Sequence, residues 1–495
     1  MLTESEIYHL IQEDLTSTRK QSASIGHKYY EGRHDILDYK LYYYNADGKL
    51  VEDTTRSNIK ICHPFFTELV DQCVQYMLSG KESFVKSDIP ELQDELDIYF
   101  GDDFKSEFAD TLTDVCAGGF GDMYAYKNIN DRLTFQYADA MGVVEVRAKD
   151  TDDHTEYVIY WYIDRIDKGT KKIKRIQVWD SKQTTYFVQV DEGKIKKDDD
   201  EPLNPRPHIV YTKDNDDSLY YDGFGFIPFF RLDANRKLTS HLQPAKALID
   251  DYALMACGLS NNLQDVSEAL YVVKGFQGDN LEEMIQNVKT KKHIGVEPDG
   301  DVDIKTVDLP HQARIQKLDI DEKNIYRFGM GFNSAQLGDG NVTNVVIKSR
   351  YALLDLKCNK LETKVRSFLK KLVKIALQEI NDINDTDYQV SDVYFEFDRE
   401  VMTNASDNAQ IEKTEAETQQ IRLTTILNAA ARLDNDTVLQ AICELFELDF
   451  EDVKASVEQN PVVDLNSASE ALANAPVEEP EKPPDDSVEG GGVIE

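Results

Sequence analysis

The sequence of 495 residues predicts a helix-rich α+β fold, and three observations support that class. Runs rich in β-branched and aromatic residues fall within about 120–230, where polar turn-like segments separate them. Two long segments further along carry apolar residues in steps of three and four, the spacing of packed helices. The beginning and the end of the chain are also periodic in the helical sense. Most of the predicted strands therefore occupy one block, with helices before and after it.

Residues 1 to about 85 are predicted to be mainly helical. Their clearest helix carries apolar side chains at intervals of three and four and stops at Gly80, consistent with a C-terminal glycine cap. These side chains are Phe66, Leu69, Val70, Cys73 and Tyr76. Residues 88–117 predict further short helices. The strand block follows, with EYVIYWYID, KIKRIQVWD and TTYFVQV, and its pattern predicts a mostly antiparallel sheet.

A long helix is predicted within 237–270. Its apolar and small residues repeat in alternating steps of three and four over about four heptads. This stem seam consists of Leu242, Ala245, Ile249, Tyr252, Ala256, Leu259, Leu263, Val266 and Leu270. A heptad seam requires a helical partner along its length, so this helix should pack lengthwise against other helices.

An α/β insertion is predicted over 271–309, with strand LYVVKGF, helix NLEEMIQNVKTKK and strands HIGVEP and VDIKTVDL around a turn at 298–301. A second helix over 310–331 returns from the insertion. The third helix is long, and its seam again has steps of four and three. That seam consists of Leu354, Cys358, Leu361, Val365, Phe368, Leu372 and Ile375. A strand, DYQVSDVYFEFDRE, completes the segment 345–403.

The end of the chain has two parts. Residues 404–465 predict a helical domain in which Asp434 or Asn435 caps one helix. Residues 466–495 are acidic and rich in proline and glycine, which predicts a disordered tail.

A glycine-rich stretch separates the second and third long helices, with glycines at 329, 331, 338 and 340. Such loops can bind phosphates, but a helix precedes this one instead of a strand, and the spacing is not GxGxxG. No lysine is placed as in a phosphate-binding loop. The sequence therefore favours a flexible connection, in which the glycines adopt positive φ and permit changes of conformation.

The formal net charge of −37 argues against a protein that grips nucleic acid through its phosphates. It allows a protein that nucleic acid passes, because an acidic wall repels phosphates. The six cysteines, at 62, 73, 116, 257, 358 and 443, form no CxxC pair, so we expect reduced, buried thiols and no zinc site. No signal peptide or membrane-spanning run is present, and folding in a cytoplasm is expected.

No GxxxxGK[ST], HExxH or GxSxG motif occurs, and the nine histidines are dispersed. We therefore expect no catalytic residue, no cofactor and no metal. The order of the elements resembles the portal proteins of tailed bacteriophages, of the siphophage type. The segments that carry the resemblance are KYYEGRHDIL, NIKICHPFFTELVDQCVQYMLSGK, IPFFRLDANRKLTSHLQPAKALIDDY, NLEEMIQNV with DGDVDIKTVDLP, and NIYRFGMGFN followed by LGDGNVTNVVIKSRYALLDLKCNKLE.

The resemblance implies a dodecamer, a ring of about twelve subunits at one capsid vertex, through which double-stranded DNA passes in packaging and ejection. The regions it implies are a wing (1–236), a stem helix (237–270), a clip (271–309), a second stem helix (310–331), a tunnel loop (332–344), a long helix with a wing strand (345–403), and a crown (404–465). The implied partners are the terminase large subunit, a head-completion or head-tail adaptor protein, and the major capsid and scaffolding proteins. The implied location is the virion.

In that picture the tunnel loop faces the channel with polar, mostly uncharged side chains. The channel-facing residues are then Asn333, Ser334, Gln336, Asp339, Gly340, Asn341, Thr343, Asn344 and Lys348. Lys348 would attract DNA weakly, whereas Arg350 is expected to pair with a carboxylate of a neighbouring subunit. Two alternatives remain, a metal-dependent phosphoryl-transfer enzyme and a scaffold protein that forms no ring. Turnover with magnesium would indicate the first, and helices without a closed ring the second.

Overall fold

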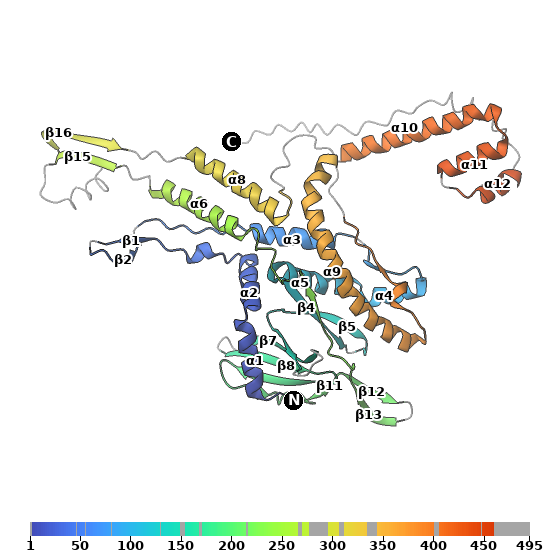
Figure 1. Ribbon diagram of the computed structural model, residues 1–495, viewed down its shortest axis with the longest axis horizontal. Coiled ribbons are helices and arrows are strands. Elements are labelled where there is room, and N and C mark those ends of the chain that lie inside the picture. Colours follow the sequence, from blue (N-terminus) through green and yellow to red (C-terminus); the bar gives the residue numbers. More distant parts are fainter. Residues whose placement is uncertain are drawn as a thin grey trace, which may run out of the picture. The chain divides into compact units, whose positions relative to one another are not determined.

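The computed structural model describes residues 2–459, except 46, 55, 81, 129, 149–153, 168–170, 214–215, 266–269, 277–295, 306–310, 334–343, 400–404 and 447. The chain divides into two compact units (Figure 1). The first comprises Met1–Gly340 and Ile347–Val401, and the second Asn341–Val346 and Met402–Glu495. The first unit combines helices with antiparallel sheets, which agrees with the predicted α+β class.

The strand block is built from two main sheets. The larger has the order β10-β9-β8-β7-β6, with β11 paired to β9, and the smaller has the order β14-β4-β5. Their bounds are β4 (Phe120–Lys127), β5 (Leu133–Ala138), β6 (Val143–Arg147), β7 (Thr155–Asp167), β8 (Lys171–Trp179), β9 (Gln183–Val190), β10 (Lys196–Lys197), β11 (Arg206–Pro207) and β14 (Phe229–Asp233). A separate pair is β12 (Ile209–Lys213) with β13 (Asp216–Asp222). All these pairings are antiparallel, as predicted.

Both faces of the larger sheet are covered. Successive residues of β7 point to opposite faces, so two neighbouring residues show what packs on each side. Helix α1 (Glu4–Thr16) lies against one face, where Ile7 and Ile11 pack around Ile159 (Figure 1). Tyr160, the next residue of β7, packs on the other face with Phe229 of the smaller sheet. The two sheets and α1 therefore share continuous apolar contacts.

The largest core joins the smaller sheet to the long helices. It contains residues of α2 (Thr18–Tyr30), α3 (Phe65–Met77), α4 (Pro90–Tyr99), α5 (Asp102–Gly118) and α9 (Asn344–Asn384). Phe108 of α5 stacks on Phe368 of α9 with ring centroids 6.1 Å apart. Six residues of the predicted α9 seam are buried, from Leu354 to Leu372, and Ile375 is partly buried. The prediction of a long packed helix is therefore confirmed, as are the short helices expected within 88–117.

Helix α6 (Lys246–Asp265) begins later than its seam suggested, so the predicted start near 237 is wrong. Pro244 has no N–H to donate, and residues 241–245 form turns. The N–H of His241 donates to the carbonyl of Cys116 in α5, at 3.0 Å, instead of to a helical partner. Helix α8 (His311–Gly329) agrees with the predicted second helix.

Three strand predictions need correction. The first 85 residues contain a strand pair, β1 (Tyr42–Tyr44) with β2 (Leu50–Glu52), besides their helices. In the insertion, β15 (Leu270–Phe276) pairs with one strand β16 (Val296–Lys305), and the predicted turn at 298–301 is an irregularity within β16. The predicted strand before residue 400 is only β17 (Tyr394–Phe395), paired with β3 (Val85–Lys86). The predicted insertion helix lies outside the described residues.

The described residues of the second unit are mainly helical, as predicted for 404–465. It contains α10 (Ala405–Ala429), α11 (Asn435–Phe446) and α12 (Phe450–Gln459). Asp434 Oδ2 accepts a hydrogen bond from the N–H of Thr437 at 3.1 Å, which confirms it as the cap of α11. The predicted tail, 466–495, lies outside the described residues. None of the described helices is both long and apolar enough to cross a membrane.

Candidate functional site

The site is built on α6 and α8, which pack against each other and are called the helix pair below. Lys317 of α8 reaches Asp251 of α6 with 2.5 Å between Nζ and Oδ2, and it also pairs with Asp321. These hydrogen bonds, the one to Asp251 first, raise the pKa of Lys317 above its ordinary value. Tyr252, which follows Asp251 in α6, makes a T-shaped contact with Phe65 of α3, with ring centroids 4.9 Å apart. The helix pair is therefore fixed to the core of the first unit.

The short segment from Gly329 to Asn333, which we call the loop root, leads from α8 into the glycine-rich stretch. The side-chain amide of Gln72 in α3 forms hydrogen bonds with both the backbone N–H and the backbone carbonyl of Phe332 in this segment. Gln72 Oε1 accepts from Phe332 N at 2.9 Å, and Gln72 Nε2 donates to Phe332 O at 2.7 Å. The ring of Phe332 stacks on Tyr351 of α9, with centroids 4.5 Å apart. The two sides of the loop are thus joined at its base.

A buried cation secures the end of α8. Lys357 of α9 is buried, and its Nζ donates to the carbonyl of Gly329 at 3.1 Å and to that of Leu69 at 3.4 Å. A cation at this position complements the negative end of the α8 dipole and satisfies a terminal carbonyl. Nearby, Tyr326 is hydrogen-bonded to Glu68, and burial, followed by that contact, raises the pKa of the phenol.

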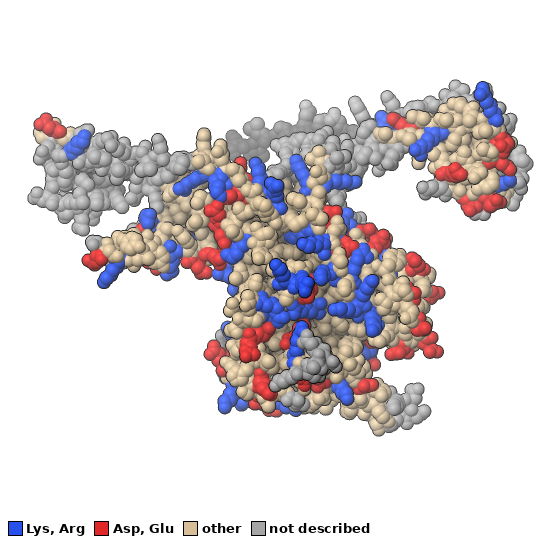
Figure 2. Space-filling view, in the orientation of Figure 1, with Lys and Arg blue, Asp and Glu red and all other residues tan. Residues whose placement is uncertain are grey.

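The charges of the first unit are separated between helices. Figure 2 shows Lys and Arg gathered over α9 and the elements beside it, and Asp and Glu gathered over α4. On α9 the exposed lysines include Lys360, Lys364, Lys370, Lys371 and Lys374. On α4 and α5 the exposed acids include Glu91, Asp94, Asp97, Asp102, Asp103 and Asp110. A chain of strongly negative net charge thus carries a long helix, α9, with a row of exposed lysines.

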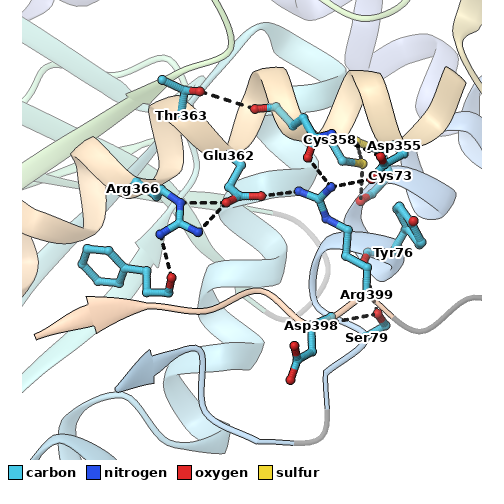
Figure 3. A network of polar contacts seen from close by, with 12 residues as sticks. Cys73, Tyr76, Ser79, Asp355, Cys358, Glu362, Thr363, Arg366, Asp398 and Arg399 are labelled. Carbon is cyan, nitrogen blue, oxygen red and sulfur yellow. Dashed lines mark hydrogen bonds and ion pairs between the residues drawn. The ribbon is translucent and has the colours of Figure 1, made fainter. Parts of the chain in front are cut away.

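Arg399 ties the last described residues of the first unit to α9 (Figure 3). Its Nη1 lies 2.7 Å from Asp355 Oδ1, and its Nη2 pairs with Glu362. The segment that precedes the second unit is therefore anchored on the same helix that follows the loop.

Comparison with known proteins identifies the family. A family model described as phage portal protein, SPP1 Gp6-like, matches residues 13–454, which include the helix pair, the loop root and all of α9. The chain belongs to this phage portal protein family. Two relatives named portal protein are each 25% identical to it. The one from Bacillus phage SPP1 aligns over 70% of this chain and 67% of its own length. The one from Clostridium phage phiCD119 aligns over 77% of this chain and 85% of its own length.

The two halves of the stem seam in this portal-family chain differ in how deeply their side chains are buried. Leu242, Ala245 and Ile249 are buried within the chain, and Tyr252 is half-buried. In the second half Leu259 is half-buried and Leu263 is 56% exposed, whereas the described residues do not include Val266. The buried stripe instead continues through Ala253 and Cys257. The second half of the seam therefore faces away from the core of its own chain.

Most of the predicted channel-facing residues fall in the loop itself. Ser334, Gln336, Asp339, Gly340, Asn341 and Thr343 lie outside the described residues, and Asn344 begins α9. Asn333 is half-buried and donates from Nδ2 to Glu322 Oε1 at 2.9 Å, so it belongs to the loop root. Lys348 is exposed, and Nη1 of Arg350 is buried without a hydrogen-bond partner among the described residues.

The glycines of the loop root have a different role from the predicted one. A Cβ added at Gly329 would lie 2.5 Å from Leu69 Cδ1, and one added at Gly331 would lie 2.2 Å from Leu69 Cδ2. The positive φ, 54°, is at Met330. Flexible glycines were the wrong interpretation for these two positions, since both permit close packing. Gly338 and Gly340 lie outside the described residues.

Sequence reasoning missed Gln72, Lys357 and Tyr351. Gln72 is separated from Phe332 by 260 positions, and no local pattern connects them. Lys357 gave the one available signal, because it directly precedes the seam residue Cys358 and lies three and four residues from the buried seam residues Leu354 and Leu361. A lysine there requires polar partners inside the chain.

Replacing Gly331 by alanine should lower the free energy of unfolding by about 1–3 kcal/mol, because the new methyl group overpacks against Leu69. Urea denaturation at fixed protein concentration measures the change. The matched background is Leu69→Ala, which removes the obstructing methyl groups and should make Gly331→Ala much less costly. An equal cost in both backgrounds would show that Leu69 is not the obstacle.

Proposed function

We propose that the chain assembles head to tail into a ring at one capsid vertex, the portal, through which DNA enters and leaves the capsid. The observation that carries this proposal is the family match over residues 13–454. The relatives' printed names agree with it. In this proposal 1–236 and 345–403 form the wing, 237–270 and 310–331 the stem, and 404–465 the crown.

Exposed apolar side chains on the helix pair support assembly. Leu263 of α6 and Ile315 and Ile320 of α8 are each more than half exposed, at 56%, 53% and 55%. Large apolar residues left in water on both helices of a packed pair are typical of surfaces that another chain covers. A ring of identical subunits requires such heterologous contacts, in which different surfaces of neighbouring copies meet.

The charge separation supports the same arrangement. Copies with net charge −37 repel one another unless opposite charges meet at the contacts. The lysines of α9 and the acids of α4 and α5 provide two complementary surfaces on one unit. Complementary surfaces at different places on one molecule favour head-to-tail association over a two-fold dimer.

The composition of the proposed channel suits passage of DNA without sequence-specific binding. The loop over 332–344 contributes mainly uncharged polar side chains, with Asp339 as its acid. Lys348, exposed in the first turns of α9, supplies a weak attraction to phosphates. The clip, 271–309, with its β15–β16 pair, is proposed to meet the terminase large subunit and later the head-tail adaptor. The capsid and scaffolding proteins are the remaining partners.

The test is complementation of a phage whose gene for this chain carries a stop codon. Capsids formed without the chain should contain no packaged DNA, and expression of the chain from a plasmid should restore nuclease-protected DNA of genome length. Quantitative PCR on nuclease-treated particles measures both. Filled capsids in the absence of the chain would contradict the proposal.

A further inference from the structure

Three potential metal ligands converge in the core beside the loop root, and a further thiol lies next to one of them. Cys73 of α3, Cys116 of α5 and His241, which precedes α6, each offer one ligand atom, and these atoms lie within 4.8 Å of one another. The thiol of Cys358 in α9 lies beside one member of this cluster, with its Sγ 3.7 Å from Cys73 Sγ (Figure 3). The three thiols are free and buried. Four elements distant in sequence thus bring thiol and imidazole groups together.

His241 provides a second, independent observation. Its Nδ1 is buried and has no hydrogen-bond partner among the described residues. Its backbone N–H donates to the carbonyl of Cys116 at 3.0 Å, which holds the imidazole beside the thiols. A buried ring nitrogen without a hydrogen-bond partner lowers the stability of the fold. The lone pair of a neutral imidazole nitrogen can bind a metal ion, which would provide the missing partner.

We propose that Cys73, Cys116 and His241 bind a structural zinc ion and that Cys358 is the fourth ligand. Sulfur and imidazole ligands suit zinc, which takes four of them in a tetrahedron in closed structural sites. With Zn–S bonds of about 2.3 Å, neighbouring sulfurs of such a tetrahedron lie about 3.8 Å apart. The Cys73–Cys358 separation of 3.7 Å already matches that edge.

Binding exchanges protons for the metal. Each of the three thiols releases its proton to solvent and the imidazole binds in its neutral form, so a site with three thiolates carries one net negative charge. The buried ammonium of Lys357, adjacent to Cys358 in the chain, is placed to offset that charge. No oxidant or other reactant is needed.

The zinc ion would join α3, α5 and α9 to the chain that enters α6. Gln72 and Leu69, which hold the loop root, lie on the same helix as Cys73. A metal at this point would therefore fix the base from which the loop extends. The sequence could not reveal this site, because its ligands lack the short spacing of zinc motifs and come from four elements.

The test measures zinc in the full-length chain purified without chelators, by inductively coupled plasma mass spectrometry. We expect about one zinc per chain, loss of it in Cys116→Ser, and retention in Cys443→Ser, whose thiol is buried in the second unit. Cys358→Ser should bind zinc more weakly than the parent chain.

A second measurement does not depend on folded variants. After removal of zinc, addition of Co²⁺ to the parent chain should produce thiolate-to-cobalt absorption and tetrahedral d–d bands, and zinc should displace both. Addition of zinc should also raise the melting temperature of the metal-free parent chain. A purified chain with no zinc and no cobalt–thiolate absorption would overturn the proposal, as would a Cys73–Cys358 disulfide in freshly prepared protein.

Discussion

Leu263→Glu should prevent the assembly of this chain while leaving each copy folded. The side chain is 56% exposed on α6, so a carboxylate there costs little within one chain. If a neighbouring copy covers this half of the seam, assembly must bury an unpaired carboxylate, which costs several kcal/mol in practice at each contact. A closed ring repeats that contact at every subunit, so the loss of assembly should be complete.

Light scattering coupled to size-exclusion chromatography measures the change in mass, and circular dichroism checks the fold. Gln264→Glu adds the same charge one residue further along α6, outside the seam, and should leave the mass unchanged. Leu263→Ala separates loss of apolar contact from burial of charge and should weaken assembly less. An unchanged mass for Leu263→Glu would mean that this part of the seam does not face a neighbouring subunit.

Replacing residues 334–342 by a short Gly-Ser linker should leave assembly intact and reduce DNA packaging to near the level seen without the chain. The structure defines where to cut. Phe332 is clamped by Gln72 and stacked on Tyr351, and Asn333 is bound to Glu322, so removal beyond residue 333 spares the loop root. The contacts that hold the base of the loop come from residues outside the replaced segment.

The complementation assay above measures packaged DNA, and the mass of the purified variant reports assembly. The matched control replaces the same residues by a Gly-Ser linker of equal length, which separates the reach of the loop from its side chains. Failure of the shortened variant to assemble would show that the loop holds subunits together. Normal packaging by the shortened variant would contradict a channel role for the loop.

The sequence predicted best the elements that have a long apolar periodicity and bury one face against their neighbours. The α9 seam persists over many turns, and the structure buries it. The same reasoning did not predict the strand pair of β1 and β2. Both strands are short and exposed, so their residues do not alternate between buried and exposed positions. The start of α6 was predicted too early. The heptad spacing extends back to Leu242, but Pro244 and the hydrogen bond from His241 to Cys116 keep the residues before Lys246 out of the helix.

The position of the candidate site could be predicted from the sequence, but the contacts that build it could not. The glycine-rich stretch marked the place where two long helices meet, since such a break in periodicity is local. The contacts that build the loop root are not local, because Gln72, Leu69 and Lys357 come from helices far apart in the chain. Glycines required for close packing and glycines required for mobility look alike in a sequence, and only the neighbouring Leu69 distinguishes them.

The proposed function requires that this chain close into a ring around a channel. Native mass spectrometry of the purified chain, combined with electron microscopy of the same sample, tests it most directly. We expect a single closed assembly of about a dozen copies with a central opening. An assembly of two-fold dimers, or an open filament without closure at any ionic strength, would contradict it.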